Sequence, residues 1–310
     1  MPEHRKISRS ATMKTRRPSA LNSASRLAKR GLARFAKHAE PLVGGIRDYL
    51  FAEMDYAPEG WSSNTSIADS WSDQVIADAQ ERHWPTLVRI LQGTGPLGVA
   101  HFPWSHRRDD RIHHNIMMSY GYVLARAARN RDRLSILDWG GGVGHYYLYS
   151  KTLLPEVTFD YHCFDVRSMC DTGKRLLPEA HFYSDDAGVH GKTFDLVISS
   201  SSLHYFENWR HTARTLAAAT GDFLYVARVQ IVCAARSFVA VHSLHRSGYR
   251  EFLSWCLNRQ ELVSCLEGAG MELLREFVYA NSWPVRGAPE RVETRGFLFR
   301  RAESDARREI

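Results

Sequence analysis

Short apolar runs alternate with helix-like segments along the second half of the chain. Four runs have the length and composition of buried strands, and the segments between them place apolar residues at helical spacing. The predicted strands are residues 135–139, 158–164, 195–200 and 223–229, and the predicted helices are residues 145–154, 169–177 and 209–218. This alternation predicts an α/β fold in which helices cover both faces of a doubly wound, mostly parallel sheet.

Helical spacing dominates the region before this alternation, over residues 41–132. Residues 72–92 and 112–130 are the strongest helix candidates, and the loop at 93–103 is rich in Gly and Pro. We therefore expect a helical N-terminal cap, followed by an α/β domain formed by residues 133–310.

Two segments of the α/β domain depart from the simple alternation. Residues 230–258 are longer than a strand-to-helix connection, which predicts an insertion that acts as a lid or forms an acceptor pocket. Residues 272–279 and 296–300 are both strand-like and are separated by a connection containing Pro and Gly. We expect these two strands to form an antiparallel hairpin at the end of the sheet.

The positive charge of the chain is concentrated at its N-terminus. The net charge is +7, but residues 1–40 contain 11 Lys and Arg against two acidic residues, which leaves 30 basic and 32 acidic side chains elsewhere. Residues 1–40 are predicted to be a largely disordered tail with a weak amphipathic helix. Such a tail can contact an anionic membrane or another polyanion, remain a solvated extension, or serve as an organelle transit peptide.

Cysteine usage and hydropathy indicate the compartment. The five cysteines include no Cys-x-x-Cys pair, and the chain has no secretory signal, which argues against disulfides and structural zinc. The fifteen histidines show no metal-ligand spacing, so we expect no metal. No apolar run approaches the ~20 residues that cross a bilayer, and we expect a cytoplasmic protein whose tail is its one means of peripheral contact with the inner membrane.

A glycine-rich turn follows the first predicted strand of the sheet and opens the next helix. Residues 138–145 read DWGGGVGH. Glycines let the backbone turn sharply and let a ligand approach, and the free N–H groups of a helix start favour a carboxylate or phosphate. A dinucleotide fingerprint would have its third glycine where His145 stands. Asp138 would repel a pyrophosphate but can bind an ammonium group, and S-adenosylmethionine offers an ammonium and a carboxylate without any phosphate.

The D-x-G-x-G-x-G pattern resembles the first motif of the class I S-adenosylmethionine-dependent methyltransferases. This resemblance implies a Rossmann-like, seven-stranded sheet and a ribose-binding acid at the end of the next strand, where Asp165 stands 21 residues after Gly144. A further acid is expected near the adenine amino group, and Asp185 and Asp186 are both candidates. The implied cofactor-binding residues are Asp138, Gly140, Gly141, Gly142, Gly144, Asp165, Asp185, Asp186 and Ser199.

Within that superfamily, the details are most similar to a poorly characterised group of bacterial methyltransferases. The glycine turn, the CDTG sequence at residues 170–173 and residues 194–205 carry this similarity. The chain departs from the commoner pattern of the group at Asp165, where Glu is usual. Either carboxylate can accept hydrogen bonds from ribose hydroxyls, so cofactor binding is still implied.

Methyl transfer from a sulfonium is an in-line displacement, which requires alignment of the reactants and exclusion of water. A hydroxyl or amine acceptor must also lose a proton, so a nearby histidine can act as a base. The candidate catalytic residues are His204, which follows a central strand, and His242 and His245 in the insertion; each can equally be a structural histidine. A basic cluster could receive an anionic acceptor or form a solvated loop, and it contains His113, His114, Arg107, Arg108 and Arg111.

These features predict an S-adenosylmethionine-dependent methyltransferase that acts on a small-molecule or glycan-like acceptor, with oxygen as the favoured target atom. Residues 199–202 are all Ser, where many nitrogen-directed nucleic-acid enzymes have Asn/Asp-Pro-Pro-Tyr. The alternative is a nucleic-acid-associated methyltransferase or binding protein that uses the basic tail. A third interpretation is a binding module that has the fold without turnover.

Overall fold

The computed structural model describes residues 54–61, 74–97, 111–242 and 252–302. All of them belong to the second of two compact units, residues 51–310, whereas the basic tail falls in the first unit, residues 1–50, outside the described residues. The strands are β1 (Met54–Ala57), β2 (Arg133–Trp139), β3 (Thr158–Phe164), β4 (His181–Tyr183), β5 (Phe194–Ser200), β6 (Thr220–Val232), β7 (Phe238–His242), β8 (Phe252–Asn258), β9 (Met271–Trp283), β10 (Val285–Arg286) and β11 (Val292–Arg301). The helices are α3 (Gln74–Leu91), α4 (Arg111–Ala127), α5 (His145–Leu153), α6 (Arg167–Leu176), α7 (Trp209–Ala219) and α8 (Arg259–Glu267), with short 3-10 turns η1 (Asp186–Gly188) and η2 (Leu203–Tyr205).

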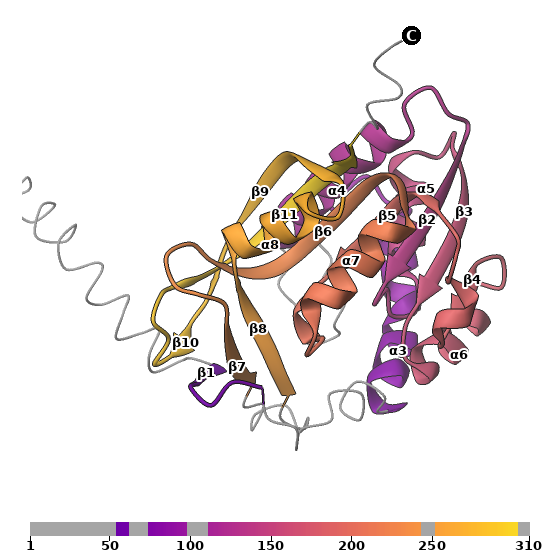
Figure 1. Ribbon diagram of the computed structural model, residues 1–310. Helices are drawn as coiled ribbons and strands as arrows, with labels where there is room; N and C mark the ends of the chain where they lie inside the picture. Colours follow the sequence, from indigo (N-terminus) through magenta and orange to yellow (C-terminus); the bar gives the residue numbers. More distant parts are fainter. Residues whose placement is uncertain (1–53, 62–73, 98–110, 243–251, 303–310) are drawn as a thin grey trace, which may run out of the picture. The chain divides into compact units, whose positions relative to one another are not determined.

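The central part of the sheet has the strand order β4-β3-β2-β5-β6-β11-β9, as Figure 1 shows. The first five of these strands are parallel, and β11 runs antiparallel between β6 and β9, which confirms the predicted hairpin. From β2 the chain winds outward to β4 and then returns to β5 on the other side of β2. In open α/β sheets the ligand binds beyond the carboxyl ends of the strands at such a reversal. The fold therefore directs attention to the ends of β2 and β5.

Four further strands extend this sheet, so the eleven strands of the described residues exceed the seven expected. The end of β6 pairs in parallel with β8, β8 pairs antiparallel with β7, and β1 connects β7 to β10. The segment 230–258 was expected to be a lid or pocket, but its described residues mostly continue the sheet. The stretch 41–132 likewise contains a strand, β1, in addition to the two predicted helices α3 and α4.

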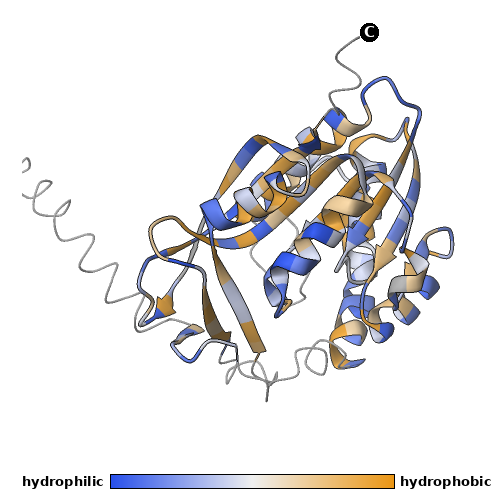
Figure 2. Cartoon of the chain, viewed as in Figure 1, coloured by the Kyte–Doolittle hydropathy of each residue, from blue (hydrophilic) through white to orange (hydrophobic). Residues whose placement is uncertain are grey.

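The central strands contain many hydrophobic residues, which are orange in Figure 2, and their apolar side chains are buried on both faces of the sheet. In β2, Leu134 and Ile136 pack on one face with residues of α4 and α5, and Leu137 and Trp139 pack on the other with residues of α7 and α8. This division follows from the two-residue period of a strand. Each fully buried aliphatic side chain stabilises the fold by roughly 1.5–3 kcal/mol. None of the described helices is both long and apolar enough to cross a membrane.

Candidate functional site

The glycine-rich turn lies directly after β2, at the reversal of the sheet. Gly140, Gly142 and Gly144 have φ angles of 73°, 60° and 94°, a left-handed conformation that favours glycine. A Cβ at Gly140 would lie 2.3 Å from the Cβ of Ser202, and a Cβ at Gly141 would lie 2.5 Å from the Asp138 carboxylate. The glycines therefore let the turn pack closely against the ends of β2 and β5.

Asp138, the penultimate residue of β2, is fully buried. One of its carboxylate oxygens accepts a hydrogen bond from the Tyr161 hydroxyl, and the other, Oδ1, has no hydrogen-bond partner among the described residues. Burial raises the pKa of Asp138 to about 7, against a smaller opposing effect of the Tyr161 hydrogen bond. A buried carboxylate with an unused oxygen suits a cationic donor, because such a partner offsets the cost of removing the charge from water.

Asp165 comes directly after β3 and connects that strand to the glycine turn. Its Oδ2 accepts a hydrogen bond from the Gly142 N–H at 2.7 Å, and its Oδ1 accepts one from the Val166 N–H at 2.7 Å. Burial raises the pKa of Asp165 to about 6, and the two backbone bonds oppose this shift. Each oxygen retains an acceptor lone pair, so the carboxylate can still bind a pair of hydroxyl groups.

Two serine hydroxyls join the end of β5 to the end of β2. Ser199 Oγ lies 2.8 Å from Ser202 Oγ, and Ser202 Oγ donates a hydrogen bond to the Trp139 carbonyl at 2.7 Å. Both serines are buried. The Ser199 hydroxyl is thus part of the link that holds the turn, and its contact with a cofactor stays a prediction.

The two remaining predicted acids follow β4. Asp185 is exposed, and Asp186 begins η1 with a side chain outside the described residues. Since β4 pairs in parallel with β3, these residues emerge beside the strand that Asp165 follows. The acids that follow β2, β3 and β4 therefore lie in that order along the sheet edge, and their assignment to cofactor groups stays a prediction.

Gln80 of α3 is a candidate site residue that the sequence did not predict. It is 5% exposed, and its Oε1 has no hydrogen-bond partner among the described residues. A Cβ at Gly142 would lie 3.0 Å from this oxygen, so the Gln80 amide packs against the glycine turn. The available signal was a polar residue at helical spacing from Ile76 and Trp84, on the otherwise apolar face of α3.

His204 and His242, two of the predicted catalytic residues, are both buried. The ring of Tyr205 connects them, with its centroid 4.2 Å from that of His204 and 6.4 Å from that of His242. Burial lowers the pKa of His204 to about 3 and that of His242 to about 4, so both are neutral near pH 7. His242 is the last residue of β7. His245 lies outside the described residues.

The basic cluster predicted near residue 110 is described only in part. His113 and His114 are half-buried on α4, and the side chain of Arg111 at the start of that helix is not described. Arg107 and Arg108 lie outside the described residues. Whether the cluster lines a pocket stays a prediction.

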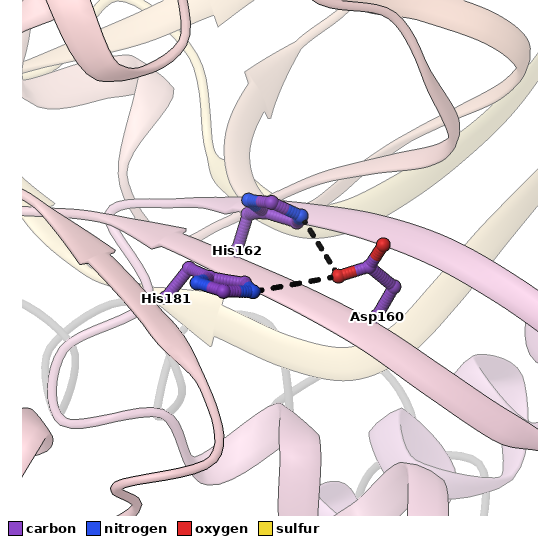
Figure 3. A group of neighbouring side chains, drawn as sticks. All are labelled: Asp160, His162 and His181. Atoms are coloured by element: carbon purple, nitrogen blue, oxygen red, sulfur yellow. Dashed lines mark hydrogen bonds and ion pairs between the residues drawn. The ribbon is translucent and has the colours of Figure 1, made fainter.

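A separate polar group on β3 and β4, the His–Asp–His cluster, consists of Asp160, His162 and His181 (Figure 3). Asp160 Oδ1 lies 3.0 Å from His162 Nε2 and 3.7 Å from His181 Nε2. One ligand atom from each residue lies within 4.8 Å of the other two, which is compatible with a three-ligand metal site. The sequence had indicated no such spacing, because the third ligand comes from the neighbouring strand.

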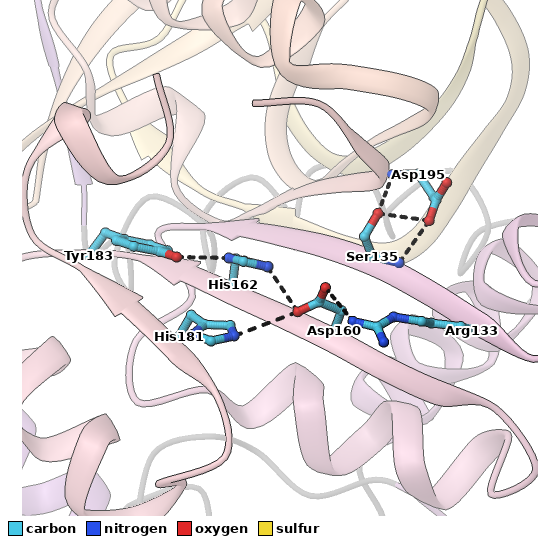
Figure 4. Close-up of polar contacts among 7 residues, drawn as sticks. All are labelled: Arg133, Ser135, Asp160, His162, His181, Tyr183 and Asp195. Carbon is cyan, nitrogen blue, oxygen red and sulfur yellow. Dashed lines mark hydrogen bonds and ion pairs between the residues drawn. The ribbon is translucent and has the colours of Figure 1, made fainter. Parts of the chain in front are cut away.

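The surroundings of the His–Asp–His cluster are cationic, which disfavours a divalent metal. Asp160 Oδ2 is already paired with Arg133 at 2.9 Å, and His162 Nδ1 lies 3.0 Å from the Tyr183 hydroxyl (Figure 4). Burial lowers the pKa of His162, and the positive charge of Lys192 adds a smaller effect in the same direction. Asp160 also lies in the first half of β3, away from the strand ends that form the glycine-turn site.

Residues 110–276 match the family model described as a methyltransferase domain. The chain belongs to this methyltransferase family. It is a class I S-adenosylmethionine-dependent methyltransferase, and S-adenosylmethionine is its cofactor. The unused Oδ1 of Asp138 and the glycine turn fit this cofactor, because they offer an acceptor for its ammonium group and N–H groups for its carboxylate.

Solved structures of methyltransferases resemble this chain in fold. The methyltransferase CcbJ from Streptomyces caelestis shares 15% identity over 77% of this chain and 100% of that chain, with a TM-score of 0.46. Magnesium protoporphyrin IX methyltransferase from Synechocystis shares 16% identity over 74% of this chain and 99% of that chain, with a TM-score of 0.42. The 1,6-didemethyltoxoflavin-N1-methyltransferase of Burkholderia thailandensis shares 11% identity over 79% and 94%, with a TM-score of 0.43. Among curated proteins the chain has no significant match.

Proposed function

We propose that this methyltransferase transfers the methyl group to a small-molecule or glycan-like acceptor, with oxygen as the target atom. The unused oxygen of buried Asp138 beside the glycine turn is the observation that carries the site assignment. In this proposal Asp138 binds the ammonium group of the cofactor, Asp165 binds the ribose hydroxyls, and Asp185 or Asp186 lies at the adenine. Gly140, Gly141, Gly142 and Gly144 form the turn that faces the cofactor, and Ser199 holds that turn against β5.

The acceptor is proposed to bind beyond the end of β5, where His204 lies and where the ring of Tyr205 connects it to His242. The cofactor supplies an activated methyl group, so the protein must align the acceptor, exclude water and accept a proton where the acceptor has one to lose. Burial lowers the pKa of both histidines, so both rings are neutral near pH 7 and can accept a hydrogen bond from an acceptor hydroxyl. The four serines at 199–202 also lack the side chains typical of nitrogen-directed nucleic-acid enzymes, which supports an oxygen acceptor.

Calorimetric titration with S-adenosylhomocysteine, the demethylated product, tests the site. We expect the wild type to bind it at micromolar concentration, and Asp165→Ala to weaken binding at least fivefold, which corresponds to about 1 kcal/mol for lost charge-assisted hydrogen bonds. Asp171→Asn, a change at an exposed acid of α6, is the matched control and should leave binding unchanged. A wild type that does not bind the product would refute the proposal.

The acceptor and its target atom are tested by isotope transfer. Small-molecule and glycan fractions are incubated with the enzyme and S-adenosylmethionine that carries a trideuterated methyl group. Mass spectrometry then identifies products that gain the labelled methyl, and fragmentation locates it. Label on nitrogen or carbon, or label confined to nucleic acid, would contradict the proposed acceptor.

A further inference from the structure

A β-bulge interrupts β6 close to the end of β5. On β6, Ala227 and Arg228 lie between two residues that are paired with β11, and both face the single residue Gly296 of that strand. Arg228 has a φ angle of 53°, a left-handed conformation that costs roughly 1 kcal/mol or more for a residue with a side chain. Bulges next to active sites commonly redirect a side chain, and here the redirected residue is an arginine.

The bulge removes Arg228 from an apolar surface. Val226 packs on the face of the sheet covered by α7 and α8, and uninterrupted alternation would place Arg228 on that same face. With the bulge, Val229 takes that position, whereas Ala227 packs on the opposite face, against α4 and α5. This alternation directs the Arg228 side chain away from the face covered by α7 and α8, toward the face covered by α4 and α5, and α5 begins directly after the glycine turn.

Electrostatic effects agree with this direction. Burial and a neighbouring histidine lower the pKa of both His145 and His204 to about 3, and the positive charge of Arg228 contributes in the same direction. Burial raises the pKa of Tyr146 and of Tyr205 to about 12, and the charge of Arg228 opposes that rise. The guanidinium therefore lies near residues that follow β2 and β5, which is the edge of the sheet where the acceptor is expected.

Arg228 has no acidic partner in the part of the chain that the structure describes. Its side chain is half-buried, yet it makes no ion pair and no hydrogen bond with a described residue. Arg295, a comparable half-buried arginine of β11, is paired with both Glu276 and Glu293. Because a partly desolvated cation is costly without a counter-charge, the surroundings of Arg228 favour an anion supplied from outside the chain.

Two further polar atoms without a described hydrogen-bond partner lie near the end of β5, on His204 and His242. His204 is 1% exposed and its Nδ1 has no hydrogen-bond partner among the described residues, and the same holds for Nε2 of His242, which is 6% exposed. The His242 ring is fixed by stacking on Phe252 at 4.2 Å. A neutral imidazole can donate one hydrogen bond to an anion or accept one from a hydroxyl, so these atoms complement a charged and hydroxylated ligand.

We propose that Arg228 is the specificity residue for an anionic acceptor. It binds a carboxylate or phosphate group of the molecule to be methylated, and His204 and His242 contact the polar substituents of that molecule. A guanidinium recognises either anion through two parallel hydrogen bonds. The inference rests on the proposed function and narrows its acceptor to an acidic small molecule, such as a hydroxy acid, an acidic sugar or a sugar phosphate.

Matched acidic and neutral probes test this inference on the full-length protein. Calorimetric titrations, with and without S-adenosylhomocysteine, compare 4-hydroxybenzoate with 4-hydroxybenzamide, glucuronate with glucose, and inorganic phosphate with buffer alone. We expect at least one acid to bind ten or more times tighter than its neutral partner. Arg228→Gln should abolish that preference, and Arg228→Lys should retain part of it. Arg236→Gln, at an exposed arginine in the connection from β6 to β7, should change nothing.

The outcomes separate this inference from the proposed function. Acids that bind no better than their neutral partners, or a preference that survives in Arg228→Gln, would overturn it. A tenfold weaker affinity of Arg228→Gln for S-adenosylhomocysteine would also overturn it, since the arginine would then bind the cofactor carboxylate. Failure of the wild type to bind S-adenosylhomocysteine refutes the proposed function instead, and the titrations without it still measure the anion preference. Thermal melting of each variant confirms that it is folded.

Discussion

The buried carboxylate of Asp138 should destabilise the cofactor-free protein whenever it is ionised. Burial moves its pKa from 3.8 to about 7. One pKa unit corresponds to about 1.4 kcal/mol, so the ionised form costs the folded state about 4 kcal/mol at pH 8. The folded state binds the proton more tightly than the unfolded state, and stability is therefore lost as pH rises from about 4 through about 7. Asp138→Asn removes this titration.

Urea unfolding of cofactor-free protein, followed by tryptophan fluorescence, measures the effect at pH 5 and pH 8. The Asn side chain keeps the Tyr161 hydrogen bond but leaves an amide without a partner, which costs about 1–2 kcal/mol. We expect Asp138→Asn to be about 2 kcal/mol more stable than the wild type at pH 8 and nearly equal to it at pH 5. The same substitution should weaken S-adenosylhomocysteine binding, because it removes the charge that the ammonium group requires.

The pH dependence distinguishes this reasoning from a simple packing effect. Asp171→Asn, at an exposed position of α6, is the control and should follow the wild type at both pH values. An Asp138→Asn variant that differs from the wild type by the same amount at pH 5 and pH 8 would refute the argument. A variant less stable than the wild type at pH 8 would do so as well.

Three further changes have definite expected outcomes. Gly140→Ala should lower the free energy of unfolding by about 3 kcal/mol, because the new Cβ would collide with Ser202. Gly191→Ala is the control: Gly191 has the same φ of 73°, but no atom lies within 4 Å of the new Cβ, so the loss should be only about 1 kcal/mol. Equal losses for the two variants in urea unfolding would contradict this prediction. Gly296→Ala places a Cβ 2.1 Å from the Tyr279 hydroxyl and should lower the thermal midpoint by several degrees, an effect that an unchanged melting curve would exclude. Dialysis against a chelator should leave methyl transfer and thermal melting unchanged, because the carboxylate of the His–Asp–His cluster is already paired with an arginine. Activity that is lost on dialysis and restored by zinc would contradict this prediction.

The central strands were predictable from sequence because each is a short run rich in apolar and aromatic residues between helix-like segments, and β5 is buried almost throughout. The predicted strand at 158–164 coincides with β3, and the predicted strand at 195–200 lacks only the first residue of β5. The strands of the extension were missed. β7 pairs with β1, and no local pattern reveals a partner so far away in the chain, so the length of residues 230–258 suggested a lid or an acceptor pocket instead.

The residues of the candidate site were likewise predictable only in part from the sequence. The glycine turn, Asp138 and Asp165 follow from local spacing, because a strand end and a helix start fix their positions within a few residues. Gln80 and Arg228 depend on tertiary contacts. The first is brought to the turn by the packing of α3, and the second is redirected by a bulge that lies opposite Gly296 of β11.

The bulge in β6 adds one residue to that strand, and the side chains beyond it lie on the faces that a regular strand one residue shorter would give them. Beyond it, Gln230 approaches Met54 and Val232 packs with the residues of the extension, while Ile231 faces α7 and α8. A single deletion at residue 227 or 228 would restore a continuous ladder and leave each of these side chains on its present face, because Val226 and Val229 would then be separated by one residue. Evolution of this enzyme can therefore exchange the residue that meets the acceptor by substitution, or remove the bulge by a one-residue deletion, without turning the end of β6 to the wrong face.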